Sequence, residues 1–175
     1  MSINPPSLPE KLSAIDVRKA HFRHESSIRS ISILYYFVGA MMSLVALAQL
    51  LPRPDGFSLR IFLFSISSLF AAAHFLLAVW LRKLDSRARI PATVLAVLGL
   101  FTFPVGTLIN GYIIYLLNSA KGVKVFSKEY IQAIQETPEI KYKTSFVVLL
   151  LVGILLFLLL VAVLAPLISM ISGGK

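Results

Sequence analysis

The stretch FPVGTLINGYIIYLLNS, residues 103–119, lies inside a run of 31 residues, 90–120, that contains no Asp, Glu, Lys or Arg. As one straight helix this run would extend about 46 Å, at about 1.5 Å per residue. The stretch also places Pro104, Gly106 and Gly111 near the middle of the run, and a proline deprives a helix of one backbone hydrogen bond. We therefore predict that the helix is interrupted between Pro104 and Gly111.

Three other stretches lack charged side chains in the same way, namely residues 30–52, 61–81 and 144–174. About 20 apolar residues suffice for a helix to cross the roughly 30 Å hydrocarbon core of a bilayer. The mean hydropathy of +0.83 is also higher than a soluble domain of this length can accommodate. The sequence predicts an all-α integral membrane protein, a bundle of about four hydrophobic segments of which the third is interrupted.

The chain is predicted to consist of two units, a polar N-terminal segment and an apolar domain with a polar loop. Residues 1–29 have the basic, amphipathic pattern of an interfacial helix, with a flexible basic tail as the alternative. Residues 30–175 are predicted to form a single helical membrane domain. Its third loop, residues 121–144, is predicted to carry a short amphipathic helix on the membrane surface, because Ser127 is a good N-cap and Pro138 ends the segment.

The distribution of basic residues bears on how the third segment is arranged. If this segment enters the membrane and returns to the same side, 14 of the 17 Lys and Arg residues lie on one side. If all four segments cross, the two sides carry 10 and 7. The positive-inside rule favours the first arrangement, a re-entrant hairpin with a cytoplasmic N-terminus. A kinked segment that crosses is the alternative.

Four polar side chains within the predicted spans form the candidate site: His74, Thr102, Thr107 and Asn110. A histidine inside a membrane can relay protons or bind a metal ion. The predicted spans contain no Asp, Glu or Cys, so we expect neutral His74 to bond a neighbouring helix instead. The other three side chains could line a small polar cavity, but we expect them first to bond carbonyl groups freed by the helix break.

No other pattern indicates a catalytic, metal or cofactor site. The chain has no cysteine, and no serine–histidine–acid set or pair of intramembrane carboxylates can be assembled from it. His21 and His24 are three residues apart, which could hold a metal weakly, but a third ligand is lacking and we expect surface histidines. The net charge of +9 comes from residues that flank the apolar runs, which indicates anionic lipid rather than nucleic acid.

The segment from Leu81 to Phe126 resembles a pattern of many small bacterial membrane proteins that have no established activity. Its elements are the basic turn LRKLDSRAR, then FPVGT at residues 103–107, GYIIYLL at residues 111–117, and Phe126. Asn110 is more polar than the residue at that position in the group, and Tyr115 stands where tryptophan is common. The resemblance covers about a third of the chain and implies a bacterial inner membrane. It implies no catalytic residues.

These observations together predict a non-enzymatic accessory or interaction protein of the bacterial cytoplasmic membrane. We expect it to contact anionic headgroups and either a protein partner or further copies of itself. The alternative is a small oligomeric transporter or channel, with a pore lined by polar residues of the second and third segments. Convergence of the four candidate side chains on one cavity would favour this alternative.

Overall fold

The computed structural model describes residues 8–50, 56–142, 144, 146, 148–150 and 152–157. All regular elements in these ranges are helices: α1 (Leu8–Ala48), α2 (Phe57–Lys83), the 3₁₀ turn η1 (Ser86–Ala88), α3 (Arg89–Gly99), α4 (Val105–Asn118), α5 (Ala120–Val125) and α6 (Lys128–Glu136). A further apolar helix runs over Val148–Phe157. The rest of the predicted fourth segment, and Lys143 within the predicted third loop, lie outside the described residues.

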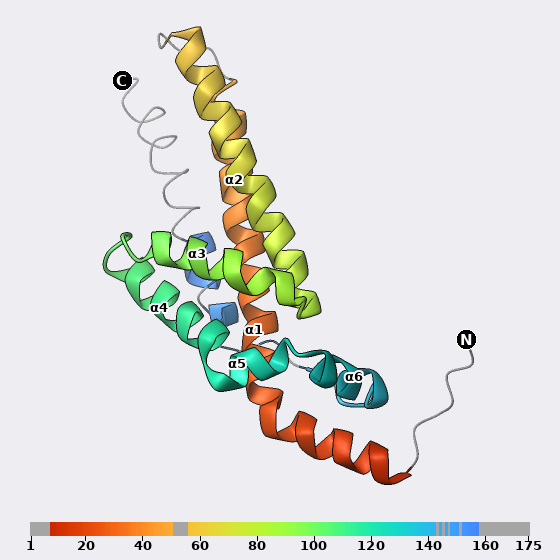
Figure 1. Ribbon diagram of the computed structural model, residues 1–175. Coiled ribbons are helices and arrows are strands. Elements are labelled where there is room, and N and C mark those ends of the chain that lie inside the picture. The colour runs from red at the N-terminus through yellow and green to blue at the C-terminus, as the bar shows by residue number, and fades with distance from the viewer. Residues whose placement is uncertain are drawn as a thin grey trace, which may run out of the picture.

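Helix α1 joins two parts that the sequence led us to expect as separate units. It runs without interruption for 41 residues, so residues 8–29 continue directly into the first apolar segment. Its upper half packs antiparallel against α2, as Figure 1 shows in orange and yellow. Gly39 permits this approach, because a Cβ built there would lie 3.3 Å from the ring of Phe75.

Two helices in the described part of the chain are long and apolar enough to cross a membrane. They are the Ser13–Ala48 part of α1, and α2. Most of the large apolar side chains of α2 are exposed, among them Phe57, Phe62 and Leu69. Apolar exposure of this extent requires another apolar phase or partner to cover it.

The third segment turns back on itself. Helices α3 and α4 pack against each other as an antiparallel hairpin on one side of the α1–α2 pair (Figure 1). At the open end of the hairpin, the Asn118 Nδ2 donates to Thr93 Oγ1 at 3.0 Å. At about 1.5 Å per residue, α3 and α4 are about 16 and 21 Å long, so neither alone matches a bilayer core. The predicted interruption is present, and a kinked continuous helix is wrong.

The interruption is shorter than predicted and lies closer to the N-terminus. It covers the turn from Leu100 to Pro104, whose Phe103–Pro104 peptide bond is cis. Gly106 and Gly111 were predicted to belong to the break, but both lie inside α4. Gly106 has a different function, since a Cβ there would lie 1.7 Å from Thr102 Oγ1 and 3.1 Å from the Gly99 carbonyl oxygen. It therefore allows the two arms of the hairpin to approach closely.

The predicted loop helix is confirmed as α6, with Ser127 as its N-cap. The Ser127 hydroxyl accepts a hydrogen bond from the Tyr130 amide at 3.2 Å. Helices α5 and α6 both lie against the first half of α1 (Figure 1). We call this unit, formed by residues 13–29 of α1 together with α5 and α6, the basic platform. Its exposed basic side chains are Lys19, Arg23, Lys121 and Lys128.

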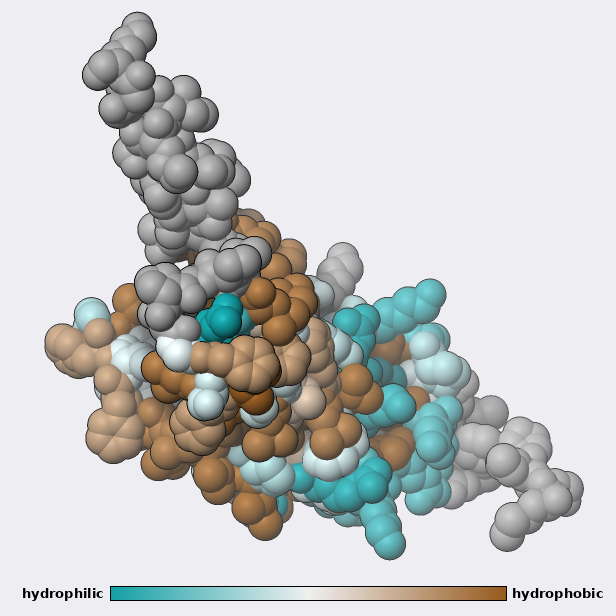
Figure 2. All heavy atoms as spheres, turned by 90° about the horizontal axis from the view of Figure 1, so that it is seen from above, coloured by the Kyte–Doolittle hydropathy of each residue, from teal (hydrophilic) through white to brown (hydrophobic). Residues whose placement is uncertain are grey.

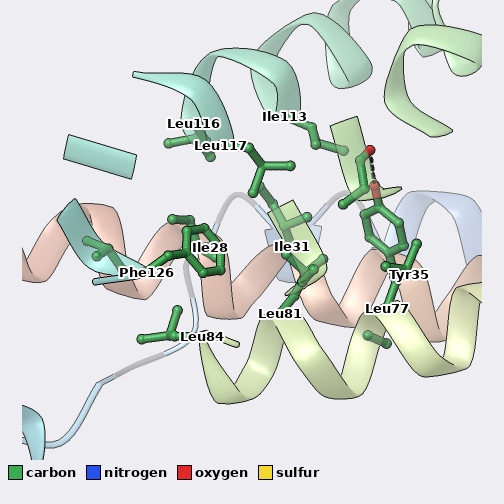
Figure 3. Close-up of a cluster of buried hydrophobic side chains, with 14 of the residues drawn as sticks. Ile28, Ile31, Tyr35, Leu77, Leu81, Leu84, Ile113, Leu116, Leu117 and Phe126 are labelled. Atoms are coloured by element: carbon green, nitrogen blue, oxygen red, sulfur yellow. Dashed lines mark hydrogen bonds between the residues drawn. The ribbon is translucent and has the colours of Figure 1, made fainter. Parts of the chain in front are cut away.

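The main buried cluster connects the platform to the helical hairpins. Figure 3 shows its side chains projecting from α1, α2 and α4 toward one another, with Phe126 following α5. Leu84 also belongs to it, although its backbone has the left-handed conformation (φ 57°) that ends α2. The fully or nearly fully buried members include Ile28, Ile31, Leu81, Leu84, Leu117 and Val125.

Figure 2 shows how polarity divides over the surface seen from above. Apolar residues dominate over the α3–α4 hairpin and the α1–α2 pair, and hydrophilic residues gather on the side where α6 and the first turns of α1 lie. On this face the platform thus differs in polarity from the apolar helices beside it.

Candidate functional site

A cavity of about 300 Å³ lies between α1, α2 and the α3–α4 hairpin. Three of the four predicted side chains line it: His74 from α2, Thr102 from the turn and Asn110 from α4. A fourth polar residue, Tyr35 of α1, also lines the cavity and was not predicted. The remaining wall is apolar, and Leu155 of the last described helix contributes to it.

Thr107 does not belong to this group. Its hydroxyl donates to the Leu100 carbonyl oxygen at 2.6 Å, which joins α4 to the end of α3 across the turn. Thr102 bonds the Gly99 carbonyl oxygen at 2.6 Å, and the Asn110 Nδ2 bonds the Gly106 carbonyl oxygen at 2.8 Å. The expected bond to a carbonyl group freed by Pro104 is confirmed for Thr107, because Leu100 lies four residues before Pro104. Thr102 and Asn110 instead bond carbonyl groups three and four residues before them in the chain.

The same bonds determine what the cavity can offer a ligand. The Tyr35 hydroxyl donates to the Ala92 carbonyl oxygen at 3.0 Å, as the dashed line in Figure 3 marks. His74 Nδ1 lies 2.8 Å from the Phe70 carbonyl oxygen. A carbonyl oxygen only accepts, so Nδ1 carries the proton and Nε2 of neutral His74 is an acceptor. His74 was expected to bond a neighbouring helix, but this bond lies within α2.

The ring of His74 packs against that of Tyr35, with a centroid separation of 5.6 Å. This contact connects His74 of α2 to α1. No Asp, Glu, Lys or Arg lines the described wall of the cavity. The cavity can therefore bind through hydrogen bonds and apolar contact, and offers no charge to balance an ion.

A second polar cluster, which sequence reasoning missed, lies within the basic platform. The carboxylate of Glu25 is completely buried, and Arg18 is only 3% exposed. Arg18 Nε donates to Glu25 Oε2 at 3.3 Å, and Arg29 Nε lies 3.1 Å from Glu25 Oε1. Tyr130 of α6 donates its hydroxyl proton to Glu25 Oε2 at 2.9 Å. We call these four residues the Glu25 cluster.

The Glu25 cluster also holds the end of α6. Arg18 donates from one terminal nitrogen to both oxygen atoms of Thr137, with 2.9 Å to Oγ1. Burial raises the pKa of Tyr130, and the neighbouring Glu25 carboxylate raises it further. The cluster therefore joins α1 to α6 by a set of bonds in which each buried charge has a partner.

Two predicted surface histidines lie in the platform interface instead. His24 is buried, and its Nε2 bonds the Leu116 carbonyl oxygen at 2.8 Å and lies 3.1 Å from Ser119 Oγ. His21 is half-buried and packs edge-on against the Tyr130 ring at 5.8 Å. The surface prediction is wrong for His24 because α4 ends beside it. In the part of the chain that the structure describes, no three metal-binding side chains come together.

One signal in the sequence could have indicated the Glu25 cluster. Ala14, Arg18, Glu25 and Ile28 recur at helical spacing and share one face of α1. Charged residues are rarely buried unless they are paired, so this spacing by itself does not indicate a buried face. The partners Tyr130 and Thr137 follow more than 100 residues later, so the sequence alone did not bring them to Glu25.

Comparisons with known proteins found no counterpart. No protein family, curated protein or solved structure matches the chain. The resemblance of residues 81–126 to small bacterial membrane proteins therefore stays a prediction.

Proposed function

We propose that the chain is a non-enzymatic accessory protein of the bacterial cytoplasmic membrane. In this proposal it is a multi-pass protein of the inner membrane with a cytoplasmic N-terminus. The basic platform lies at the cytoplasmic surface, where it contacts anionic headgroups and a protein partner or a second copy. The observation that carries the proposal is the unbroken α1, which connects the platform directly to an apolar segment.

Three features support this arrangement. The Glu25 cluster fixes α6 to α1, so the platform keeps one orientation relative to the apolar helices. Its exposed basic side chains suit a negatively charged lipid surface. The short arms of the α3–α4 hairpin suit a segment that enters a bilayer and returns, which agrees with the distribution of Lys and Arg.

Gentle detergent extraction followed by mass spectrometry tests the proposal. The intact protein should carry acidic lipid or a co-purifying protein, and replacing Lys19, Arg23, Lys121 and Lys128 by alanine should remove it. Arg60→Ala is the control, because it removes a basic side chain near the start of α2, away from the platform. This substitution should leave the lipid or the protein bound. A lone monomer without lipid or partner would contradict the proposal.

A second candidate, an oligomeric transporter or channel, is supported by one observation. Three of the four predicted polar side chains line the same cavity. Flux measured in proteoliposomes over a panel of small solutes tests it, with His74→Ala and Asn110→Ala expected to reduce transport. A flux that neither substitution alters would count against this candidate.

A further inference from the structure

We propose that the cavity between α1, α2 and the α3–α4 hairpin binds a neutral lipophilic molecule through a hydroxyl group. The ligand class is an alcohol or phenol with an apolar body. This inference is independent of the platform function proposed above, because it uses a different part of the chain.

The hydrogen-bond inventory of the cavity determines the polarity of the ligand. The hydroxyl protons of Tyr35 and Thr102, the Nδ1 proton of His74 and one amide proton of Asn110 are directed to backbone carbonyl groups. What remains for a ligand is mainly acceptor capacity: His74 Nε2, the Asn110 side-chain carbonyl and oxygen lone pairs. A ligand complementary to this set donates a hydrogen bond.

The absence of charge from the described wall determines that the ligand is neutral. A carboxylate or ammonium group would lose its hydration on entry and meet no opposite charge. A hydroxyl loses far less, and one hydrogen bond to an acceptor such as His74 Nε2 compensates for it. The apolar wall, formed by residues such as Leu34, Val38 and Ile109, then covers the ligand's hydrocarbon.

The volume limits the size of the bound part. At about 300 Å³ the cavity lies at the lower end of the range for small-molecule sites. One or two fused rings with a hydroxyl fit this space, and a longer tail would extend out of it. The close approach at Gly99, where a Cβ would lie 2.3 Å from Asn110 Nδ2, holds the amide of Asn110 in place beside this space.

The probe we choose is 2-naphthol, with 2-methoxynaphthalene as the analogue that has no donor and 2-naphthoate as the charged one. The full chain is placed in lipid nanodiscs with ¹⁵N-labelled histidine. We expect 2-naphthol to shift the Nε2 resonance of His74 saturably, while His21 and His24 stay unchanged. The other two probes should leave His74 unshifted.

Two variants complete the experiment. His74→Phe keeps an aromatic ring but removes the acceptor, and should weaken saturable binding of 2-naphthol about tenfold, as expected for one hydrogen bond. Because this variant lacks the histidine reporter, its binding and that of the native chain are compared by titration of the fluorescence of 2-naphthol itself. Ser65→Ala, also on α2, removes a hydroxyl that bonds only its own helix at Ile61, and should bind as the native chain does. The proposal is overturned if 2-naphthol gives no saturable shift, if 2-methoxynaphthalene shifts His74 equally, or if His74→Phe binds normally.

Discussion

At the scale of single residues, Glu25 is the position on which the platform depends most. Its carboxylate is the one anion between Arg18 and Arg29 in the Glu25 cluster, and it also accepts from Tyr130. Removing one member of a buried charge cluster leaves the others without compensation, which costs more than the intact cluster contributes.

Replacing Glu25 by leucine should lower the free energy of separating α6 from α1 by about 3 kcal/mol. Hydrogen exchange of the α6 amides measures this opening directly. Glu129→Leu is the matched control, because Glu129 is an exposed carboxylate of α6 that pairs with Lys124. Its loss should change the opening energy by less than about 1 kcal/mol. Equal effects of the two substitutions would contradict the described role of Glu25.

The raised pKa of Tyr130 predicts how the platform responds to alkaline pH. Below the ordinary tyrosine pKa of about 10, Tyr130 is protonated whether or not α6 is docked, so stability is constant. Above it, the released helix loses the proton that the docked helix retains, and docking weakens as pH rises. The protection factors of the α6 amides, which correct for the base-catalysed intrinsic exchange rate, should therefore fall progressively as pH rises above about 10. Tyr130→Phe should reduce this fall, and protection factors with the same pH dependence in both proteins would refute the assignment.

At the scale of helices, the hairpin depends on how closely its arms approach. Gly106→Ala places a methyl group against Thr102 and the Gly99 carbonyl oxygen, so we expect a loss of about 1–3 kcal/mol. Gly111 lies on the same helix with nothing within 4 Å of a built Cβ, and Gly111→Ala is the control. Thermal unfolding in detergent should show a lower midpoint for the first substitution only. A lower midpoint for Gly111→Ala as well would argue against the close contact.

The helix boundaries could be predicted where the sequence itself interrupts a helix. Pro104 correctly indicated that the third segment is interrupted, although the break ends at Pro104 rather than beginning there, and Ser127 correctly indicated the start of α6. We divided α1 at residue 29 because polarity changes there, yet no glycine or proline lies between Pro9 and Gly39. A helix can continue from a polar environment into an apolar one without ending where the polarity changes. The unbroken α1 could therefore have been predicted from the sequence.

Part of the candidate site could also be predicted from the sequence. His74, Thr102 and Asn110 stand out as polar residues in apolar runs, which is a signal the sequence carries. Tyr35 was not predicted, since a tyrosine near the start of a span gives no indication of what it faces. The hydroxyl of Thr107 bonds the Leu100 carbonyl oxygen because the tight turn at Leu100–Pro104 brings the two residues together. The sequence did not indicate the backbone geometry of this turn.

At the scale of the whole molecule, the central claim is that the third segment returns to the side from which it starts. In the structure, the α3–α4 hairpin brings the chain back beside the first half of α1, and α5 and α6 follow there (Figure 1). The distribution of Lys and Arg led to the same arrangement from sequence. The Glu25 cluster, by contrast, depends on this return and could not be foreseen without it.

Labelling of single cysteines by a membrane-impermeant maleimide tests this claim most directly, because the chain has no native cysteine. Ser58→Cys marks the start of α2, Ser86→Cys marks the turn after it, and Lys128→Cys marks α6, all at exposed positions. In intact cells and in inverted vesicles, Lys128→Cys should react from the same side as Ser86→Cys and from the side opposite to Ser58→Cys. Reaction of Lys128→Cys from the same side as Ser58→Cys would mean that the third segment crosses the membrane, and would contradict the account.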